Sequence, residues 1–325
     1  MKLRRLAVVL LALVLALGLL TGGDGASAQG SPAQPSLLLY NTVESLLAGD
    51  LLHTVTIDDV NRDLAAFPPN WPVVGVGTTN WFGRNGELMP EGTAAALHYW
   101  WADPDPPTHA TIRDLAAWRT DRALGGEPYL PFVGLAVGDP AAAVTLSLDD
   151  VDDVHAWLAA RLAAQGIALA GIRLEGSFGP VQTTVAYNIP LTGLDLSGGY
   201  VGDDYFRFGD YAPAAWSMVG LYAAQPALQP AVAAPGQALH LHGYQPATML
   251  GGHIGRAAAQ QVTATVWPLT DVVARRGRLQ GPKAGWVPAP LARSGLLPRL
   301  TLEPGQRAKL PAFWWPTNGR RAVPD

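Results

Sequence analysis

Cysteine is absent from this chain of 325 residues. Without thiols the protein has no disulfide bonds, no thiolate-bound zinc, no iron–sulfur cluster and no cysteine nucleophile. Any metal must therefore be bound through nitrogen and oxygen. Charge is also scarce, since charged residues make up 15% of the sequence against roughly 25% in an average soluble protein. The net charge of −4 offers no basic surface for nucleic acid, which we do not expect as a partner.

Low-complexity sequence is absent too. The 36 glycines and 28 prolines together stay below the roughly 25–30% that marks low-complexity chains, although they imply many turns. Hydrophobic residues make up 49% of the sequence, which is too much for a disordered chain. The length suits one large domain or two ordinary ones, with enough material for a core.

The N-terminus has the pattern of a secretory signal peptide. Lys2, Arg4 and Arg5 precede an apolar stretch from residue 6 to residue 20, and Ala26-Ser27-Ala28 supplies small residues for cleavage. A membrane anchor is the alternative, but a spanning helix needs about 18–20 apolar residues. We therefore expect cleavage after Ala28, no membrane association afterwards, and a secreted or periplasmic location.

The hydrophobic pattern predicts a mixed α/β (α+β) fold with strands and a few helices that do not alternate strictly. Expected helices are a short one capped by Asn41 and Glu44, a second starting at Thr56 with Asp59, and two longer ones over 111–122 and 148–164. Asn85-Gly86 suggests the turn of a hairpin. The expected strands are 36–40, 73–79, the segment from 87 onward, 97–101, 130–137, 170–178, 216–222, 237–243 and 261–267.

These elements suggest two mixed β-sheet subdomains with flanking helices. The expected organisation is a signal peptide (1–28), a linker (29–36), an N-terminal mixed-sheet domain (37–190), a C-terminal sheet domain (191–280) and a Pro-rich tail (281–325).

Three of the seven histidines lie close together in the sequence. His240 and His242 are two residues apart, so on a strand both point to one face, and His253 follows after the length of a turn and an antiparallel return. Three neutral imidazoles with water in the remaining positions are typical of a catalytic zinc site. We therefore predict a Zn²⁺ site on the C-terminal sheet. The alternative for His240 and His242 is two surface or hydrogen-bonded histidines. We expect His53, His98, His109 and His155 to be ordinary core or surface residues.

A cupin site also uses a His-x-His strand, but a carboxylate usually follows three to five residues later. Pro246 and Ala247 occupy that stretch here, which disfavours a cupin.

Several further segments are similar to the α-acetolactate decarboxylase family over roughly residues 37–270. The spacing of the three histidines matches the zinc ligands of that family. The other matching segments are the opening 39–50, Gly75-Val76-Gly77-Thr78, Asn85-Gly86-Glu87, Gly176-Ser177-Phe178 with Val181, and Val219-Gly220.

This resemblance implies a zinc-dependent carboxy-lyase that converts 2-acetolactate, a small 2-hydroxy-3-oxo acid, into acetoin and CO₂. It assigns Glu87 as the carboxyl group that delivers a proton and Thr78 as a residue lining the site. A solvated hairpin residue is the alternative for Glu87. A second copy of the chain, as a homodimer, is the candidate protein partner.

Two departures from the family pattern leave a second hypothesis open. Thr184 stands where the family has an arginine that grips the substrate carboxylate, and Arg173 is the candidate replacement. The family also draws a second glutamate from a helical tail, whereas this tail is Pro-rich with Glu303 in a context that does not match. The alternative is therefore a catalytically altered relative that keeps the zinc site and binds a small ligand or partner.

Overall fold

The structure is a computed structural model, and it describes the chain in segments. The predicted signal peptide and tail lie outside the described residues, as do His109 and the expected domain boundary at residue 190. Among the residues described, no helix is long and apolar enough to cross a membrane. The described segments are residues 33–51, 53–81, 84–103, 110–115, 129–186, 205–234, 236–275 and 278–279.

Most strands join in one large sheet. Its order is β10-β9-β11-β12-β13-β6-β5-β4-β3-β7-β1-β14, with β8 added beside β13, and a small second sheet pairs β15 with β2. Neighbouring strands are antiparallel except β1 and β14, which are parallel. The strands are β1 (Ser36–Tyr40), β2 (His53–Thr54), β3 (Pro72–Trp81), β4 (Arg84–Thr93), β5 (Ala96–Asp103), β6 (Thr111–Asp114), β7 (Tyr129–Val137), β8 (Val144–Val151), β9 (Leu169–Ala186), β10 (Phe206–Tyr211), β11 (Ala214–Ala223), β12 (Leu239–Gln245), β13 (Leu250–Pro268), β14 (Asp271–Arg275) and β15 (Arg278–Leu279).

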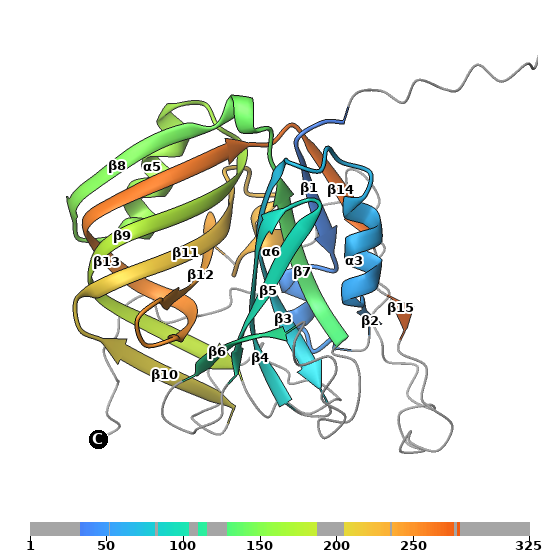
Figure 1. Ribbon diagram of the computed structural model, residues 1–325, viewed down its shortest axis with the longest axis horizontal. Helices are drawn as coiled ribbons and strands as arrows, with labels where there is room; N and C mark the ends of the chain where they lie inside the picture. The colour runs from blue at the N-terminus through green and yellow to red at the C-terminus, as the bar shows by residue number, and fades with distance from the viewer. Residues whose placement is uncertain are drawn as a thin grey trace, which may run out of the picture. The chain divides into compact units, whose positions relative to one another are not determined.

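Helices are few and short. Figure 1 shows α5 beside β8 and β9, and α3 beside β1 and β14. This arrangement confirms the expected mixed α+β class, with a large mixed sheet and few helices. The helices are α2 (Val43–Leu47), α3 (Ile57–Leu64), α5 (Val154–Ala164), α6 (Gln229–Val232) and the 3₁₀ turn η2 (Pro140–Ala142).

The long strands β9 and β13 close part of the sheet on itself. Besides its place in the strand order, β9 also pairs with β13, so that β9, β11, β12 and β13 form a closed ring of hydrogen-bonded strands. One buried cluster joins this ring to α5 through Val154, Leu158 and Leu162. A second cluster, with Val76, Phe132, Val219 and Leu221, packs β3 and β7 against β11. The second cluster borders the site described below.

The structure confirms the second predicted helix and corrects the first. Thr56 caps α3 in a reciprocal capping box with Asp59, as expected. For α2 the cap is Thr42, whose side chain accepts from the Ser45 amide, and not Asn41. Asn41 instead adopts a positive φ of 64° and donates to the carbonyl of Pro131. An Asn in that conformation forms the turn ahead of the helix.

Two predicted helices are partly strands. Residues 111–114 form β6, which pairs with β5, and residues 116–122 lie outside the described part. Residues 144–151 form β8 on the edge of β13, because Leu146 and Leu148 are buried while Thr145 and Ser147 are exposed. That alternation has a period of two. The helix α5 starts only after Asp153, whose side chain accepts from the Ala156 amide.

The hairpin of β3 and β4 turns earlier than predicted. Asn85 and Gly86 lie inside β4, where they face Asn80 and Thr79 of β3. A side chain at Gly86 has no room, since an added Cβ would be 2.1 Å from the Trp101 indole nitrogen. The glycine therefore permits close packing of β4 on β5 instead of forming the turn.

Candidate metal centre

The three predicted histidines converge at the junction of β12 and β13. His240 and His242 point to the same face of β12, and His253 is the register partner of His242 on β13. One nitrogen from each ring lies within 4.8 Å of the others. The strands approach closely here because β13 has Gly251, where an added Cβ would be 2.1 Å from the carbonyl oxygen of Gly243. The group could bind a metal ion.

Backbone carbonyls orient two of the rings. His240 Nδ1 lies 2.7 Å from the carbonyl oxygen of Val232, and His242 Nδ1 lies 2.8 Å from that of Leu88. A carbonyl only accepts, so both Nδ1 atoms carry the hydrogen, and in neutral rings both Nε2 atoms carry lone pairs. This second contact of a ligating histidine is the usual arrangement in metal sites.

The facing nitrogens form a set of donors for a cation. His240 Nε2 and His242 Nε2 are 3.1 Å apart. Two lone pairs at this distance repel each other unless a cation lies between them. Nitrogens bound to one tetrahedral zinc are roughly 3.3 Å apart, given bonds of about 2.0–2.1 Å. The residues therefore fit a metal ion held by three imidazoles.

Burial keeps the three rings neutral. It lowers the pKa of His240 to about 4, and it lowers the pKa of His242 and His253 well below the ordinary value, with help from the neighbouring imidazoles. Neutral imidazole is the form that binds a metal. The centre is therefore ready for a metal at neutral pH without first losing protons.

Strand β4 brings a carboxyl group to the histidines. Glu87 Oε2 lies 3.6 Å from His242 Nε2, and Glu87 Oε1 accepts from the Ala186 amide at 3.1 Å. Burial raises the pKa of Glu87 to about 7, although the amide hydrogen bond opposes this shift. Thr78 faces Glu87 across β3 and β4 and donates to the carbonyl of Gly86. Glu87 is thus able to hold a proton near neutral pH beside the imidazoles.

A pocket opens onto this group. Its cavity volume is about 100 Å³, and Thr78, Glu87, Thr184, His240 and His253 contribute to its lining. Apolar side chains also line the pocket, and we call them the apolar wall. They belong to Val43, Leu46, Leu47, Leu51, Phe132 and Phe206.

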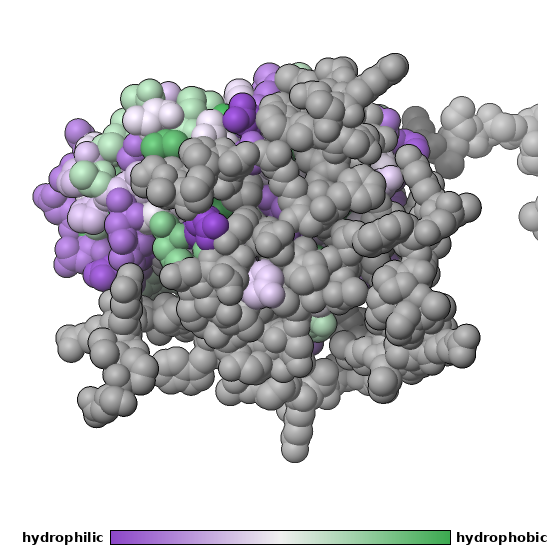
Figure 2. Space-filling model, turned by 90° about the horizontal axis from the view of Figure 1, so that it is seen from below, coloured by the Kyte–Doolittle hydropathy of each residue, from purple (hydrophilic) through white to green (hydrophobic). Residues whose placement is uncertain are grey.

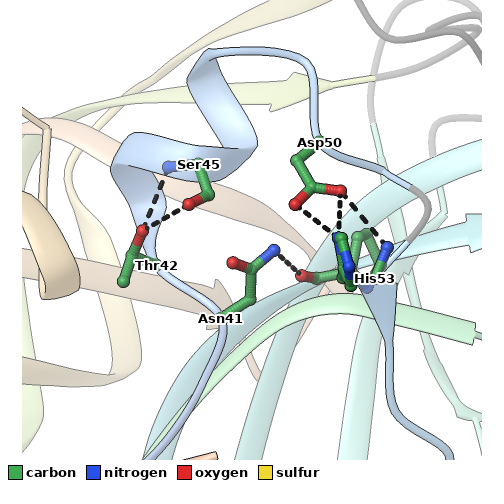
Figure 3. A network of polar contacts seen from close by, with 6 residues as sticks. Asn41, Thr42, Ser45, Asp50 and His53 are labelled. Carbon is green, nitrogen blue, oxygen red and sulfur yellow. Dashed lines mark hydrogen bonds and ion pairs between the residues drawn. The ribbon is translucent and has the colours of Figure 1, made fainter. Parts of the chain in front are cut away.

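Polar contacts hold α2 at this wall (Figure 3). Thr42 caps the helix, and Asn41 ties its start to the carbonyl of Pro131 in β7. After the helix, the carboxylate of Asp50 accepts from the His53 amide and contacts His53 Nδ1 at 2.7 Å. His53 is therefore a structural residue beside the pocket, in line with its expected ordinary role.

The structure separates the two residues considered for the substrate carboxylate. Thr184 lines the pocket and is buried. Arg173 does not contribute to the described lining and instead pairs with Glu91, 3.2 Å away. Among the described residues that line the pocket there is no arginine or lysine.

Sequence reasoning missed the groups that orient the histidines and Glu87. The carbonyls of Val232 and Leu88 and the amide of Ala186 belong to the backbone, so no side-chain pattern indicates them. Glu91 did have a signal, because it lies four residues after Glu87 on one strand and so on the same face.

Figure 2 shows the face of the molecule that lies at the bottom of Figure 1. On this face the coloured residues at the left are mainly hydrophilic, with scattered hydrophobic ones. Among the described residues, the large hydrophobic side chains that are exposed are Phe208 and Val272.

No family model matches the sequence, and no curated protein matches it at the sequence level. Solved structures do match the fold. The α-acetolactate decarboxylase of Bacillus subtilis strain 168 has a TM-score of 0.54 at 17% identity, over 76% of this chain and 94% of that chain. The acetolactate decarboxylase of Bacillus subtilis subspecies spizizenii has a TM-score of 0.54 at 17% identity, over 74% and 89%.

A Staphylococcus aureus protein of unknown function, described as similar to α-acetolactate decarboxylase, has a TM-score of 0.53 at 15% identity, over 74% of this chain and 88% of that chain. At these identities the comparisons show that this chain shares the fold of these proteins.

Proposed function

We propose that the protein is a zinc-dependent decarboxylase acting on a small 2-hydroxy-3-oxo acid, with 2-acetolactate as the first substrate to test. The observation that carries this proposal is the partly buried carboxyl group of Glu87, 3.6 Å from one of three converging imidazoles. The shared fold with acetolactate decarboxylases supports it. The N-terminal pattern of a signal peptide supports a secreted or periplasmic location.

His240, His242 and His253 would hold the ion. Nitrogen donors without a competing thiolate suit zinc. When bound, the ion would supply a Lewis acid that stabilises the negative charge developing on the ketone oxygen as CO₂ leaves.

Glu87 then has to deliver a proton. When the bond to the carboxylate breaks, its electron pair moves toward the ketone and leaves an enolate, which must gain one proton on carbon to give acetoin. The Ala186 amide holds Glu87 Oε1, which leaves Oε2 to carry the proton on the side of the imidazoles. With a pKa of about 7, Glu87 is suited to general acid catalysis near neutral pH.

The apolar wall contributes by excluding water. Leu46 and Leu47 of α2 and Phe132 of β7 line the pocket together with the polar groups. A site with little water strengthens the electrostatic interactions at the reacting atoms. The wall also suits the methyl groups of the substrate.

The test is acetoin formation from racemic 2-acetolactate by the mature protein. We expect activity that a chelator abolishes and that added Zn²⁺ restores. A protein that binds zinc but forms no acetoin would contradict the decarboxylase proposal and favour a binding protein.

Thr184 favours that second function, a relative that binds a small ligand without turning it over. A carboxylate gripped by arginine gains two charge-assisted hydrogen bonds of roughly 1.5–3 kcal/mol each, whereas the hydroxyl of Thr184 has one hydrogen to donate and carries no positive charge. Thr184→Arg should therefore raise kcat/KM mainly through a lower KM if the enzyme is a weak decarboxylase. If neither protein forms acetoin, the binding function is supported instead.

A further inference from the structure

A second polar network lies further along β4 from Glu87. The Glu91 carboxylate accepts three hydrogen bonds: Oε1 from Trp100 Nε1 at 2.8 Å and from the Tyr244 hydroxyl at 3.3 Å, and Oε2 from Arg173 at 3.2 Å. The three donors come from β5, β12 and β9. One carboxylate thus ties together four strands that meet beside the metal centre.

The network joins β4, which carries Glu87, to β12, which carries His240 and His242. Glu87 and Glu91 lie on the same face of β4, and Tyr244 follows His242 by two residues on the same face of β12. These strands are not neighbours in the sheet. Side chains connect them, through His242 to the Leu88 carbonyl and through Tyr244 to Glu91.

Arg173 connects β9 to the same carboxylate on β4. It faces Val219 of β11, and Val219 in turn faces His242 of β12, so the three residues lie in one row across the strands. The Arg173 side chain reaches over this row to Glu91. The pair is partly shielded, with 31% of the Arg173 side chain and 14% of the Glu91 side chain exposed.

Two hydrogen bonds and a ring contact hold the side chain of Tyr244. Its hydroxyl donates to Glu91, and a further hydrogen bond comes from Ser217, its register partner on β11. Its ring packs against Trp100, with ring centres 6.1 Å apart. A tyrosine held in this way transmits the position of β4 to β12.

We propose that Glu91 is a positioning residue of the metal centre, which holds β4 against β12 and so sets where Glu87 and the Leu88 carbonyl meet His242. The inference rests on the proposed metal site but not on the identity of the reaction. In this arrangement Arg173 serves Glu91 and not a substrate carboxylate.

The test compares Glu91→Gln with a matched control elsewhere in the fold. Asp63 accepts from the Tyr40 hydroxyl at 2.8 Å and lies 3.5 Å from Arg275 Nε, so it has the same kinds of partners away from the histidines. The measurements are Zn²⁺ affinity by chelator competition, the visible absorption spectrum of the Co²⁺-substituted protein, and stability in urea.

We expect Glu91→Gln to weaken zinc binding by about 10–100-fold, the range for residues that orient metal ligands, and to shift the Co²⁺ bands. Asp63→Asn should lower stability while leaving the zinc affinity and the spectrum unchanged. Tyr244→Phe keeps the ring, removes one hydrogen bond to Glu91, and should weaken zinc binding by a smaller factor. It provides a second variant if Glu91→Gln does not fold.

Unchanged zinc affinity and an unchanged Co²⁺ spectrum in the folded variants would overturn the positioning role and leave the metal site standing. An equal loss in Asp63→Asn would also overturn it, because the effect would then follow stability alone. If the wild-type protein binds no metal, the proposed metal site fails, and this proposal fails with it.

Discussion

Strands β3, β4 and β7 carry different residues on their two faces. The face toward β12 carries Thr78, Glu87 and Glu91, of which Thr78 and Glu87 line the pocket. The face toward α3 carries Leu88, Val133 and Leu135, which pack in one buried cluster with residues of α3 such as Leu64. We refer to these as the histidine face and the helix face.

The two faces differ in what holds them together. On the histidine face, polar groups fixed by hydrogen bonds to distant strands lie next to buried apolar residues such as Val76 and Phe132, which pack against β11. On the helix face, apolar side chains supply the stabilisation, and polar contacts such as that of Tyr40 with Asp63 lie beside the apolar cluster. We infer that the polar groups of the site are confined to one face of this layer of sheet, whereas both faces contribute apolar packing. Substitution of those polar groups and substitution of leucines on the helix face should therefore change different observables.

The largest effect is expected from removing a metal ligand. His242→Ala takes away one of three nitrogens and should reduce bound zinc from one per chain to nearly none, while the helix face keeps the protein folded. Elemental analysis after gel filtration measures the zinc. His98→Ala is the control, since His98 is a largely exposed histidine on β5. Full zinc retention in His242→Ala would exclude the centre.

Features with a local sequence signal could be predicted, whereas features that depend on tertiary pairing could not. The histidine group followed from the period of a strand, and α3 from its capping box, because both signals are local. The helix predicted over 148–164 was wrong at its start, since Val151 and Val154 fit a helical stripe while the alternation of Leu146 and Leu148 belongs to a strand. That segment pairs with β13. Local sequence patterns do not indicate such a pairing, because it depends on the tertiary structure.

Contacts between distant segments could not be predicted from local sequence patterns. Arg173 and Glu91 are 82 residues apart in the sequence, and neither residue indicates its partner. The Val232 carbonyl that orients His240 comes from the short helix α6, which had no predicted counterpart. The residue types at the site were therefore predictable, whereas the groups that orient them required the fold.

On the helix face, Leu135→Ala should cost about 2–5 kcal/mol in the free energy of unfolding, the usual range for a buried leucine. Leu135 is fully buried on β7. Urea unfolding gives the stability, and zinc affinity measured below the transition should match the wild type. A loss of affinity in the folded variant would show that the two faces are coupled.

Glu87→Gln tests the histidine face at a residue that is not a metal ligand. The amide keeps the size of the side chain but cannot deliver a proton, so turnover should fall by about 10²-fold or more. Zinc content should remain that of the wild type. Steady-state kinetics of acetoin formation with metal analysis measures both. Unchanged turnover would remove Glu87 from the mechanism.

The smallest effect concerns the helix face at alkaline pH. Burial, together with the hydrogen bond to Asp63, raises the pKa of Tyr40 above its ordinary value. The folded protein therefore binds this proton more tightly than the unfolded chain, whose tyrosines titrate near pH ~10. The resulting stability is fully present below pH ~10 and is lost as the pH rises further.

Tyr40→Phe removes the ionisable group and its hydrogen bond. Stability at neutral pH should fall by about 1 kcal/mol, the net contribution of a typical hydrogen bond. Above pH ~10 the variant should lose less stability per pH unit than the wild type, because one fewer proton is released on unfolding. Urea unfolding from pH 7 to pH 11 measures both effects. Zinc affinity at pH 7 should not change, since Tyr40 belongs to the apolar cluster of the helix face. If the free energy of unfolding falls equally per pH unit above pH ~10 in the two proteins, the alkaline loss of stability comes from other tyrosines.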